Sequence, residues 1–429
     1  MRQTLAFFGG PKTVTAESHE RWPLLTEEDV AAVTSLLRRG EISITTGSGI
    51  IQELEQTFAD YLGVRHALAQ CNGTSCLHAA LFAVGVGYGD EVIVPTYTWP
   101  STASTVLLCN AIPVFCDVKP DTLTADPADI ERKITPATKA IAVVHLWGHP
   151  AEMDEILAIA RRHRLAVIED ASHAHGATYK GRKVGSIGDV GCFSLQASKA
   201  LPGGEAGVAV TNNPDLFDRM LTLSHYGGRI ERDSLTGQYT QFAFTGFGPK
   251  YRVHPLAAAI AHVQLRHLDD YIEARRQNLD YLTAGLVEIP GITPPYTAGH
   301  VTRGAWYGYR LLFDQARVNR VPKVRFMTAL RAEGVEVDDE RYRLLHFEPL
   351  YQGPEIAGAC PYPPPEIRAR MRSYHVGDLP IAEGIHPRLM SLPTFTHQPC
   401  TNLLDQYIAA FQKVVYNSEQ LLEEAQPVR

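Results

Sequence analysis

The stretch GDVGCFSLQASKALPGGEAGVAVT, residues 188–211, places Lys199 between two short apolar segments. Upstream, LAVIEDASHAHG, residues 165–176, is another apolar segment, and it ends in Glu169 and Asp170. Continuous apolar runs of this length are typical of strands that are covered on both faces of a sheet. Because ligands bind at the carboxyl ends of such strands, the two stretches predict that Lys199 and Asp170 belong to one site.

Apolar segments alternate with helical patterns over most of the chain, which indicates an α/β fold around a mostly parallel sheet. The expected strands are 91–96, 112–118, 140–148, 165–172, 190–195 and 207–211. The first clear helix is expected over 26–40, where Thr26 and Asp29 form a capping box and Val30, Val33 and Leu37 share one face.

A long helix is expected over residues 254–286, and it would bridge to a smaller α+β domain. The sequence therefore predicts an N-terminal arm at 1–25, a large domain at 26–275 and a small C-terminal domain at 276–429. Within the large domain, segment 225–252 has no clear periodicity. A loop of that length is usually functional or mobile, so we expect it to reach over a site in its own subunit or in a partner.

Composition excludes several classes of protein. The 429 residues carry a net charge of −7, which gives no electrostatic reason to expect nucleic acid or an anionic membrane as partner. No apolar run approaches the ~20 residues of a membrane helix, and the N-terminus is too weakly apolar for a signal peptide. The seven cysteines show no zinc-ligand spacing, so we expect no metal site, no disulfides and a cytoplasmic location.

The segment CNGTSC, residues 71–76, offers a seat for a phosphate. Gly73, Thr74 and Ser75 would open a helix with free backbone N–H groups, two hydroxyls and the positive end of the helix dipole. The same residues are also an ordinary helix cap, and this segment alone does not separate the two interpretations.

Asp170 and Lys199 add two further groups that could bind a ligand. A buried carboxylate at a strand end needs a cationic partner, which a protonated pyridine nitrogen would supply, although a capped turn or an arginine would also satisfy it. A lysine near that carboxylate and near a phosphate seat can form a Schiff base with an aldehyde. Phosphate seat, carboxylate and amine together predict pyridoxal phosphate as cofactor.

The chain resembles the sugar aminotransferases named after DegT, DnrJ and StrS, which are fold-type I pyridoxal-phosphate enzymes. The resemblance is carried by five segments and runs from about residue 20 to the C-terminus. They are NGTSCLHAAL (72–81), VIVPTYTW (92–99), VHLWGHPAEMD (144–154), VIEDASHAHGATYKGRKVGSIGDVGCFSLQASKALPGGEAG (167–207) and KYRVHPLAAAIAHVQL (250–265). It implies a large domain with a mostly parallel sheet and a smaller C-terminal α+β domain.

The resemblance also implies roles for individual residues. Lys199 would hold the cofactor as a Schiff base and then move the proton, and Asp170 would pair with the pyridine nitrogen. The other implied cofactor contacts are Trp99 stacked on the ring, Thr74, Ser75 and Ser194 at the phosphate, and His173 beside the cofactor. Lys250 stands where many relatives have an Asn that reaches the neighbouring subunit's phosphate. Relatives with His at the lysine position catalyse dehydration, and Lys199 argues against that branch.

By the same resemblance, the expected reaction is ping-pong transamination from glutamate or glutamine to a keto sugar, with active sites shared across a homodimer. A nucleotide-linked acceptor would need a diphosphate groove, for which Arg229, Arg232 and Lys250 are candidates. A keto-cyclitol acceptor of the scyllo-inosose type stays open, and Tyr342 and His346 could line a pocket for either. A non-catalytic cofactor-binding protein on the same fold is a remoter alternative, which an intact Lys199 and Asp170 disfavour.

Overall fold

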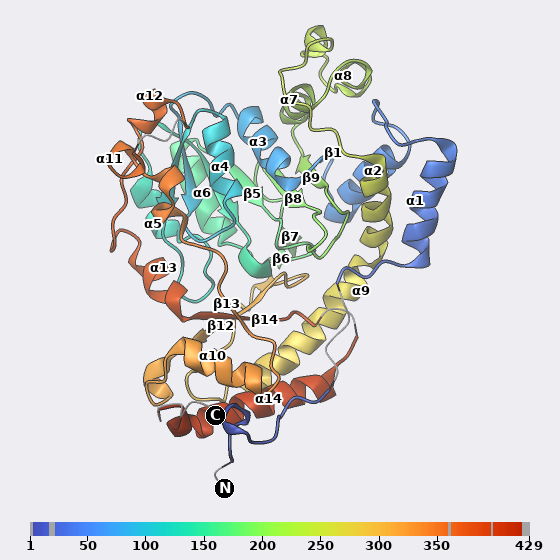
Figure 1. Cartoon of the computed structure of the whole chain (residues 1–429). Helices are drawn as coiled ribbons and strands as arrows, with labels where there is room; N and C mark the ends of the chain where they lie inside the picture. Colours follow the sequence, from blue (N-terminus) through green and yellow to red (C-terminus); the bar gives the residue numbers. More distant parts are fainter. Residues whose placement is uncertain (1–2, 17–21, 359–361, 396–397, 423–429) are drawn as a thin grey trace.

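The computed structural model describes residues 3–16, 22–358, 362–395 and 398–422 (Figure 1). A seven-stranded sheet forms the upper part of the molecule, with strand order β1-β9-β8-β5-β4-β2-β3. Its strands are β1 (His66–Gln70), β2 (Glu91–Pro95), β3 (Ile112–Cys116), β4 (Thr138–Val144), β5 (Ala166–Asp170), β8 (Val190–Ser194) and β9 (Gly207–Thr211). The α/β class and all six predicted strands are confirmed, whereas β1 was not predicted.

Strand direction brings the chemically important segments to one edge of this sheet. β9 pairs antiparallel with β1 and β8, and every other pairing in the sheet is parallel. The carboxyl ends of β5 and β8 therefore lie at the same edge as the start of β9. Asp170 ends β5, and Lys199 lies in the connection from β8 to β9 at that edge.

Helices cover the sheet and connect its strands. They are α1 (Glu27–Arg39), α2 (Ile50–Leu62), α3 (Gly73–Ala83), α4 (Ser101–Leu108), α5 (Pro127–Lys133), α6 (Met153–His163), α7 (Pro214–Ser224), α8 (Gly228–Asp233) and α9 (Pro255–Leu286). α3 packs against β8, β9, α4 and α7, whereas α2 packs against β1 and α9. Because α3 starts directly after β1, its N-terminus also lies at the edge that carries Asp170 and Lys199.

The lower part of the molecule is built around an antiparallel sheet of order β10-β12-β14-β13. Its strands are β10 (Ile292–Thr293), β12 (Tyr309–Phe313), β13 (Asp338–Asp339) and β14 (Leu389–Leu392), and its helices are α10 (Lys323–Ala332) and α14 (Thr401–Tyr416). Shorter elements complete the chain: β6 (Thr178–Tyr179), β7 (Arg182–Lys183), β11 (Val301–Thr302), α11 (Pro354–Ala357), α12 (Pro365–Arg368) and α13 (Pro380–Ile385).

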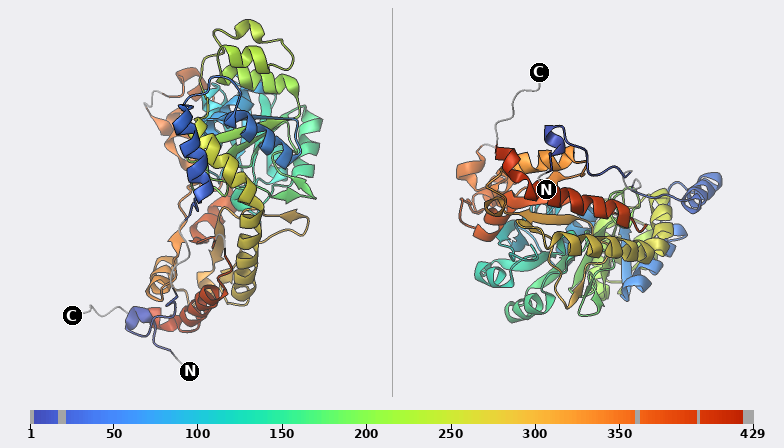
Figure 2. Two further views of the ribbon diagram at one scale, coloured as in Figure 1. Left: turned by 90° about the vertical axis from the view of Figure 1, so that its right-hand side faces the viewer. Right: turned by 90° about the horizontal axis from the view of Figure 1, so that it is seen from below.

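Helix α9 joins the two parts. It runs diagonally from the upper sheet to α14 and the lower sheet (Figures 1 and 2). With 32 residues and a rise of about 1.5 Å per residue it spans about 48 Å. Separate hydrophobic clusters form around the upper and the lower sheet, and α9 contributes leucines to both. The predicted division at residues 275 and 276 falls inside α9, and the predicted domain boundaries stay a prediction.

The first helix differs from a simple amphipathic one. Its capping box is present, because Thr26 accepts from the Asp29 amide and Asp29 accepts from that of Thr26. The apolar face does not pack on the described core, since Val30 is 54% and Leu37 is 52% exposed. Segment 225–252 is also more ordered than its pattern suggested, and contains α8.

Two smaller predictions concern cysteines and membrane helices. Six cysteines are free, and Cys360 lies outside the described residues. None of the helices that the structure describes has the length and hydropathy needed to cross a membrane.

Candidate active site

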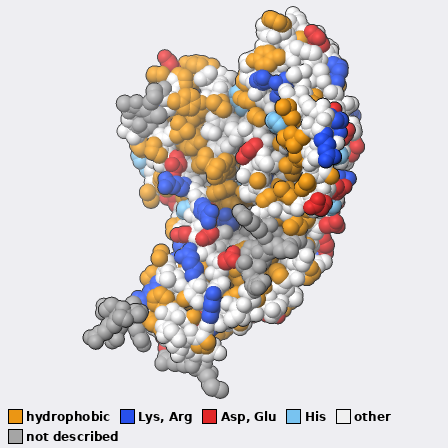
Figure 3. Space-filling model, turned by 45° about the vertical axis from the view of Figure 1, so that its right-hand side comes forward, with side chains coloured by type: hydrophobic (Ala, Val, Ile, Leu, Met, Phe, Trp, Pro, Cys, Tyr) orange, Lys and Arg blue, Asp and Glu red, His pale blue; other side chains and the backbone are white. Residues whose placement is uncertain are grey.

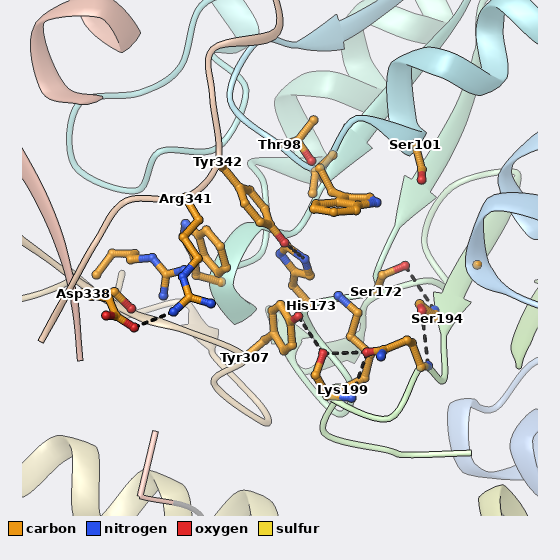
Figure 4. Close-up of a pocket in the computed structure, with 18 of the residues that line it drawn as sticks. Thr98, Ser101, Ser172, His173, Ser194, Lys199, Tyr307, Asp338, Arg341 and Tyr342 are labelled. Carbon is orange, nitrogen blue, oxygen red and sulfur yellow. Dashed lines mark hydrogen bonds and ion pairs between the residues drawn. The ribbon is translucent and has the colours of Figure 1, made fainter. Parts of the chain in front are cut away.

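A cavity of about 1140 Å³ opens at the edge of the upper sheet where Asp170 and Lys199 lie. Its walls come from β5, β8, the start of α3 and, on the opposite side, residues of β13 and β14. In Figure 4, Ser101 and Ser194 lie at one end, Asp338 and Arg341 lie at the other, and Lys199, His173 and Tyr307 lie between them. The upper and lower parts of the molecule therefore both build this site.

Asp170 is a buried carboxylate with neutral donors only. Its Oδ2 accepts from the Thr102 hydroxyl at 2.8 Å, and its Oδ1 accepts from the Ser172 amide at 3.2 Å. No lysine, arginine or histidine of the described residues lies within ion-pair distance of it, although the side chain lines the cavity. A buried anion without a cation is costly, so this position suits a positively charged group brought by a ligand.

Lys199 is held at both its backbone and its amine. The indole N–H of Trp22 donates to its carbonyl oxygen at 3.0 Å. Its Nζ lies 3.8 Å from the centroid of the Tyr307 ring, and the Tyr307 hydroxyl contacts Ser198 Oγ at 3.1 Å. Burial lowers the pKa of the Lys199 amine, while Tyr307 and Asp170 act in the opposite direction. A lowered pKa makes the neutral, nucleophilic amine more accessible near neutral pH.

The end of the cavity where the sequence predicts a phosphate seat is formed by the start of α3. Asn72 caps the helix by accepting from the Ser75 amide at 2.8 Å, which leaves the amides of Gly73 and Thr74 without an intrahelical partner. Thr74 Oγ1 lies 2.8 Å from Ser101 Oγ, and Ser194 lines the same end. A Cβ on Gly73 would lie 2.8 Å from the Ser194 Cβ, so only glycine lets α3 approach β8 this closely.

An aromatic wall lies beside Lys199. The ring of His173 stacks on Trp147 with centroids 5.0 Å apart and on Tyr307 at 4.4 Å. Tyr342 contacts His173 Nε2 through its hydroxyl at 3.3 Å. Burial, followed by the charges of Lys199 and Arg310, lowers the pKa of His173 well below its usual value. His173 is therefore a neutral ring at physiological pH.

The cavity brings together most of the cofactor residues expected from the sequence. Those that line it are Gly73, Thr74, Trp99, Asp170, His173, Ser194 and Lys199, together with the substrate candidate Tyr342. Ser75 does not line it, because its hydroxyl is used in the helix cap and donates to the Asn72 carbonyl at 2.6 Å. Lys250 is exposed and does not line it either.

The structure does not bring the other three substrate candidates to the cavity. Arg229 is 1% exposed and donates to both carboxylate oxygens of Glu55, at 2.7 and 2.9 Å. Arg232 pairs with Asp233 on the same helix. His346 is fully buried, with Nδ1 2.5 Å from the Thr96 hydroxyl. Each is held by partners in its own region, so none of them can be assigned to substrate from this chain's geometry.

The cavity is also lined by residues that were not predicted as site residues, and three of them bear on Asp170 and Lys199. Ser172 lies two residues after Asp170, and its hydroxyl accepts from the Ser194 amide at 3.1 Å, which ties the segment after β5 to β8. Tyr307 and Arg310 come from the lower part of the chain, more than a hundred residues after Lys199. Only the tertiary fold places the latter two beside the lysine, and no local spacing indicated it.

The residues present fit pyridoxal phosphate. A helix N-terminus with hydroxyls suits its phosphate, Asp170 suits its pyridine nitrogen, and the Lys199 amine suits its aldehyde. Trp99 lines the same cavity as an exposed aromatic side chain.

Comparison with known proteins agrees with this geometry. L-glutamine:2-deoxy-scyllo-inosose aminotransferase of Streptoalloteichus tenebrarius is 38% identical over 383 residues, which cover 88% of each chain. GDP-perosamine synthase of Caulobacter vibrioides is 36% identical, over 87% of this chain and 92% of its own. The structure of S. venezuelae DesV with a ketimine intermediate matches with a TM-score of 0.76 and 29% identity, over 91% of this chain and 94% of its own, which confirms the fold-type I prediction. Residues 23–401 match the DegT/DnrJ/EryC1/StrS aminotransferase family, and the chain belongs to that family.

Proposed function

We propose that this enzyme is a pyridoxal-phosphate-dependent aminotransferase that moves an amino group from glutamine or glutamate to the carbonyl of a keto sugar in amino-sugar or other natural-product biosynthesis. The observation that carries the proposal is a single cavity that joins the buried Lys199 amine, the unpaired Asp170 carboxylate and the N-terminus of α3. A non-catalytic role would not require an amine whose pKa is lowered and whose position is fixed from two sides.

In this reaction pyridoxal phosphate supplies an aldehyde that takes up the amino group and a ring that stores electrons. Thr74, Ser194 and the α3 amides would hold its phosphate, and Asp170 would keep its ring nitrogen protonated. The Lys199 amine would take up the proton of the donor Cα as general base and return it as general acid. The donor leaves as a keto acid in the first half, and the oxygen of its new carbonyl group comes from water. In the second half, the acceptor carbonyl gains the nitrogen and its oxygen departs as water.

A keto-cyclitol is the second candidate acceptor, and two observations favour it. The arginines expected to form a diphosphate groove, Arg229 and Arg232, do not line the cavity. The names of several relatives that are 35–38% identical specify glutamine and an inosose. The name of GDP-perosamine synthase specifies a nucleotide sugar, and that relative is 36% identical, so both acceptor classes belong in the test.

The proposal includes a cytoplasmic homodimer with shared active sites. Apolar side chains on α1, among them Val30 and Leu37, are left exposed, as is Phe244 in segment 225–252, which is 93% exposed. A second copy would cover such surfaces. Lys250 lies in the same segment and is exposed, which is compatible with a contact to the partner's cofactor phosphate.

The test is an acceptor screen with the purified holoenzyme. Glutamine and glutamate are offered as donors, with scyllo-inosose and a panel of nucleotide-linked keto sugars as acceptors, and amino products are identified by mass spectrometry. Lys199→Ala serves as the inactive control. We expect one acceptor class to be aminated by the wild type only. If the wild type consumes neither donor, or if borohydride reduction attaches the cofactor to another lysine, the proposal fails.

A further inference from the structure

Both substrates of an aminotransferase occupy the same cavity in turn, and they differ in charge. The amino donor carries an α-carboxylate beside the reacting carbon, whereas the carbonyl group of a keto sugar or keto-cyclitol has no charged neighbour. The cavity therefore needs a cation for the donor whose charge remains compensated when the uncharged carbonyl group of an acceptor takes the place of the donor. An uncompensated charge in a buried site would oppose acceptor binding.

Four lysine and arginine side chains line the cavity among the described residues: Lys199, Arg310, Arg331 and Arg341. Lys199 is committed to the cofactor. The side chains of Arg331 and Arg341 are 49% and 78% exposed, and Asp338 is the acidic neighbour of both. On the face shown in Figure 3, acidic and basic side chains lie close together on the surface between the upper and lower parts of the molecule, where solvent screens their charges. Among the three arginines, only Arg310 is largely buried, with 13% of its side chain exposed.

Arg310 is linked to the catalytic lysine through two aromatic rings, Trp147 and Tyr307. Its guanidinium stacks on the ring of Trp147, with Cζ 3.7 Å from the ring centroid. Trp147 in turn is parallel to Tyr307, at 6.0 Å between centroids and an interplanar angle of 13°. Tyr307 contacts the Lys199 amine. This stack fixes the plane of the guanidinium and separates the cavity from a smaller one of about 200 Å³, which Trp147 and Arg310 also border.

Glu340 supplies the compensating charge. Its side chain is 1% exposed, and its Oε2 accepts from Arg310 Nε at 2.6 Å. Its Oε1 accepts from the Tyr342 amide at 2.8 Å, so the carboxylate is fixed from two sides. Only Nε of the arginine is used in this pair. No hydrogen bond joins either terminal nitrogen of Arg310 to a described residue, which leaves the bidentate edge of the guanidinium for a second carboxylate.

We infer that Arg310 is the specificity-determining residue that binds the α-carboxylate of the amino donor, with Glu340 holding it in place and balancing its charge while the acceptor reacts. The inference rests on the proposed aminotransferase function and deepens it. The guanidinium keeps its bond to Glu340 throughout, so exchange between the two substrates requires no movement of a charged side chain. An acceptor then meets a neutral ion pair, and a donor meets two free N–H groups.

The test compares two donors and two half-reactions in the holoenzyme. Arg310→Met removes the charge, Arg310→Lys keeps a point charge, and Arg331→Met is the control from the same cavity. Donor binding is measured at equilibrium with α-methylglutamine, which has no Cα proton to lose, and with glutamine α-amide, in which the carboxylate is replaced by a neutral amide. The acceptor half-reaction is followed separately, starting from aminated enzyme.

We expect Arg310→Met to weaken α-methylglutamine binding by about 100-fold and Arg310→Lys by about 10-fold, with Arg331→Met unchanged. Binding of the α-amide should change less than threefold in all three variants, as should the acceptor half-reaction. Equal losses for the charged and neutral donor would overturn the inference, and so would a selective loss for a nucleotide-linked acceptor. If Arg310→Met does not fold, the Arg310→Lys comparison alone decides. A wild type that processes neither donor refutes the proposed function instead.

Discussion

The ring of Tyr307 lies 3.8 Å from the Nζ of Lys199, so an aromatic face meets the amine to which we assign the chemistry. A tyrosine face attracts the ammonium form of lysine, while burial favours the neutral amine. The pKa of Tyr307 reflects the same contact: burial raises it, but Lys199 and the Ser198 hydroxyl bring it below its ordinary value. The pKa of Lys199 therefore depends on two opposing effects, burial and the contact with Tyr307. A substitution can remove the contact with Tyr307.

We expect Tyr307→Leu to lower the pKa of Lys199 further in the cofactor-free enzyme, because the ammonium form loses a cation–π contact, which contributes about 0.5–2 kcal/mol. Tyr307→Phe keeps the ring and should produce a smaller change. The measurement is the pH dependence of Lys199 modification by an amine reagent, quantified by peptide mass spectrometry. Identical titration curves for the wild type and Tyr307→Leu would show that the ring does not influence the amine.

Asp170→Asn tests the carboxylate. We expect the variant to fold and to retain some cofactor, because the asparagine oxygen can still accept from the Ser172 amide while its NH2 group donates to the Thr102 hydroxyl. Asparagine cannot keep the ring nitrogen protonated, so transamination should fall by orders of magnitude with a smaller effect on donor binding. Single-turnover absorbance measurements separate the two quantities. Near-wild-type turnover would exclude the pyridinium role of Asp170.

Arg229→Met and Arg232→Met are a matched pair of variants at the two arginines that the sequence analysis proposed for a diphosphate groove. Arg229 is buried against Glu55, and its removal leaves a buried carboxylate without its cation, so we expect a loss of about 3–5 kcal/mol in unfolding free energy. Arg232 is 44% exposed at its side chain, and its removal should cost less than about 0.5 kcal/mol. Urea denaturation measures both. A stable Arg229→Met variant with a raised KM for a nucleotide sugar would restore the substrate assignment.

Order along the chain was enough to predict the sheet and the two central residues. β5 and β8 are buried strands with continuous apolar character, and a parallel sheet brings their carboxyl ends to one edge. Asp170 at the end of β5 and Lys199 in the connection after β8 are therefore neighbours because of the sheet topology. Gly73 was predicted only as part of the phosphate seat, and its close approach to β8 is revealed by the fold.

Contacts between distant segments could not be predicted in the same way. The segment that carries Tyr307 and Arg310 is held near the cavity by two hydrogen bonds. Arg275 donates to the Ala305 carbonyl at 2.8 Å, and Arg303 donates to the Trp147 carbonyl at 3.4 Å. Neither contact has a local sequence pattern. The prediction that Arg229 contacts the substrate is not supported, for a different reason. An arginine in a glycine-rich segment is typically solvated, and only the fold reveals that Glu55 from α2 buries it.

The last prediction concerns His149, which is buried between two backbone partners. Its Nδ1 lies 2.7 Å from the Pro150 carbonyl and its Nε2 lies 3.3 Å from the Ala298 amide. A carbonyl requires a proton on Nδ1 and an amide N–H requires a lone pair on Nε2, so this geometry accepts only the neutral ring. Burial, followed by the charge of Arg303, accordingly lowers the pKa of His149 from 6.5 to about 3.

In the unfolded chain His149 binds a proton below its ordinary pKa of about 6.5, whereas in the folded chain it does so only near pH 3. Between these values the unfolded state binds more protons, so this residue's contribution to stability is complete above pH 6.5 and is lost as pH falls, by about 1.4 kcal/mol per pH unit. We expect His149→Gln, whose amide oxygen can accept from Ala298, to flatten the decline in melting temperature between pH 6.5 and pH 4.5, measured by differential scanning fluorimetry. His163→Gln, at an exposed position of α6, is the matched control and should leave the decline unchanged. A His149→Gln curve parallel to that of the wild type would mean that other groups cause the acid sensitivity.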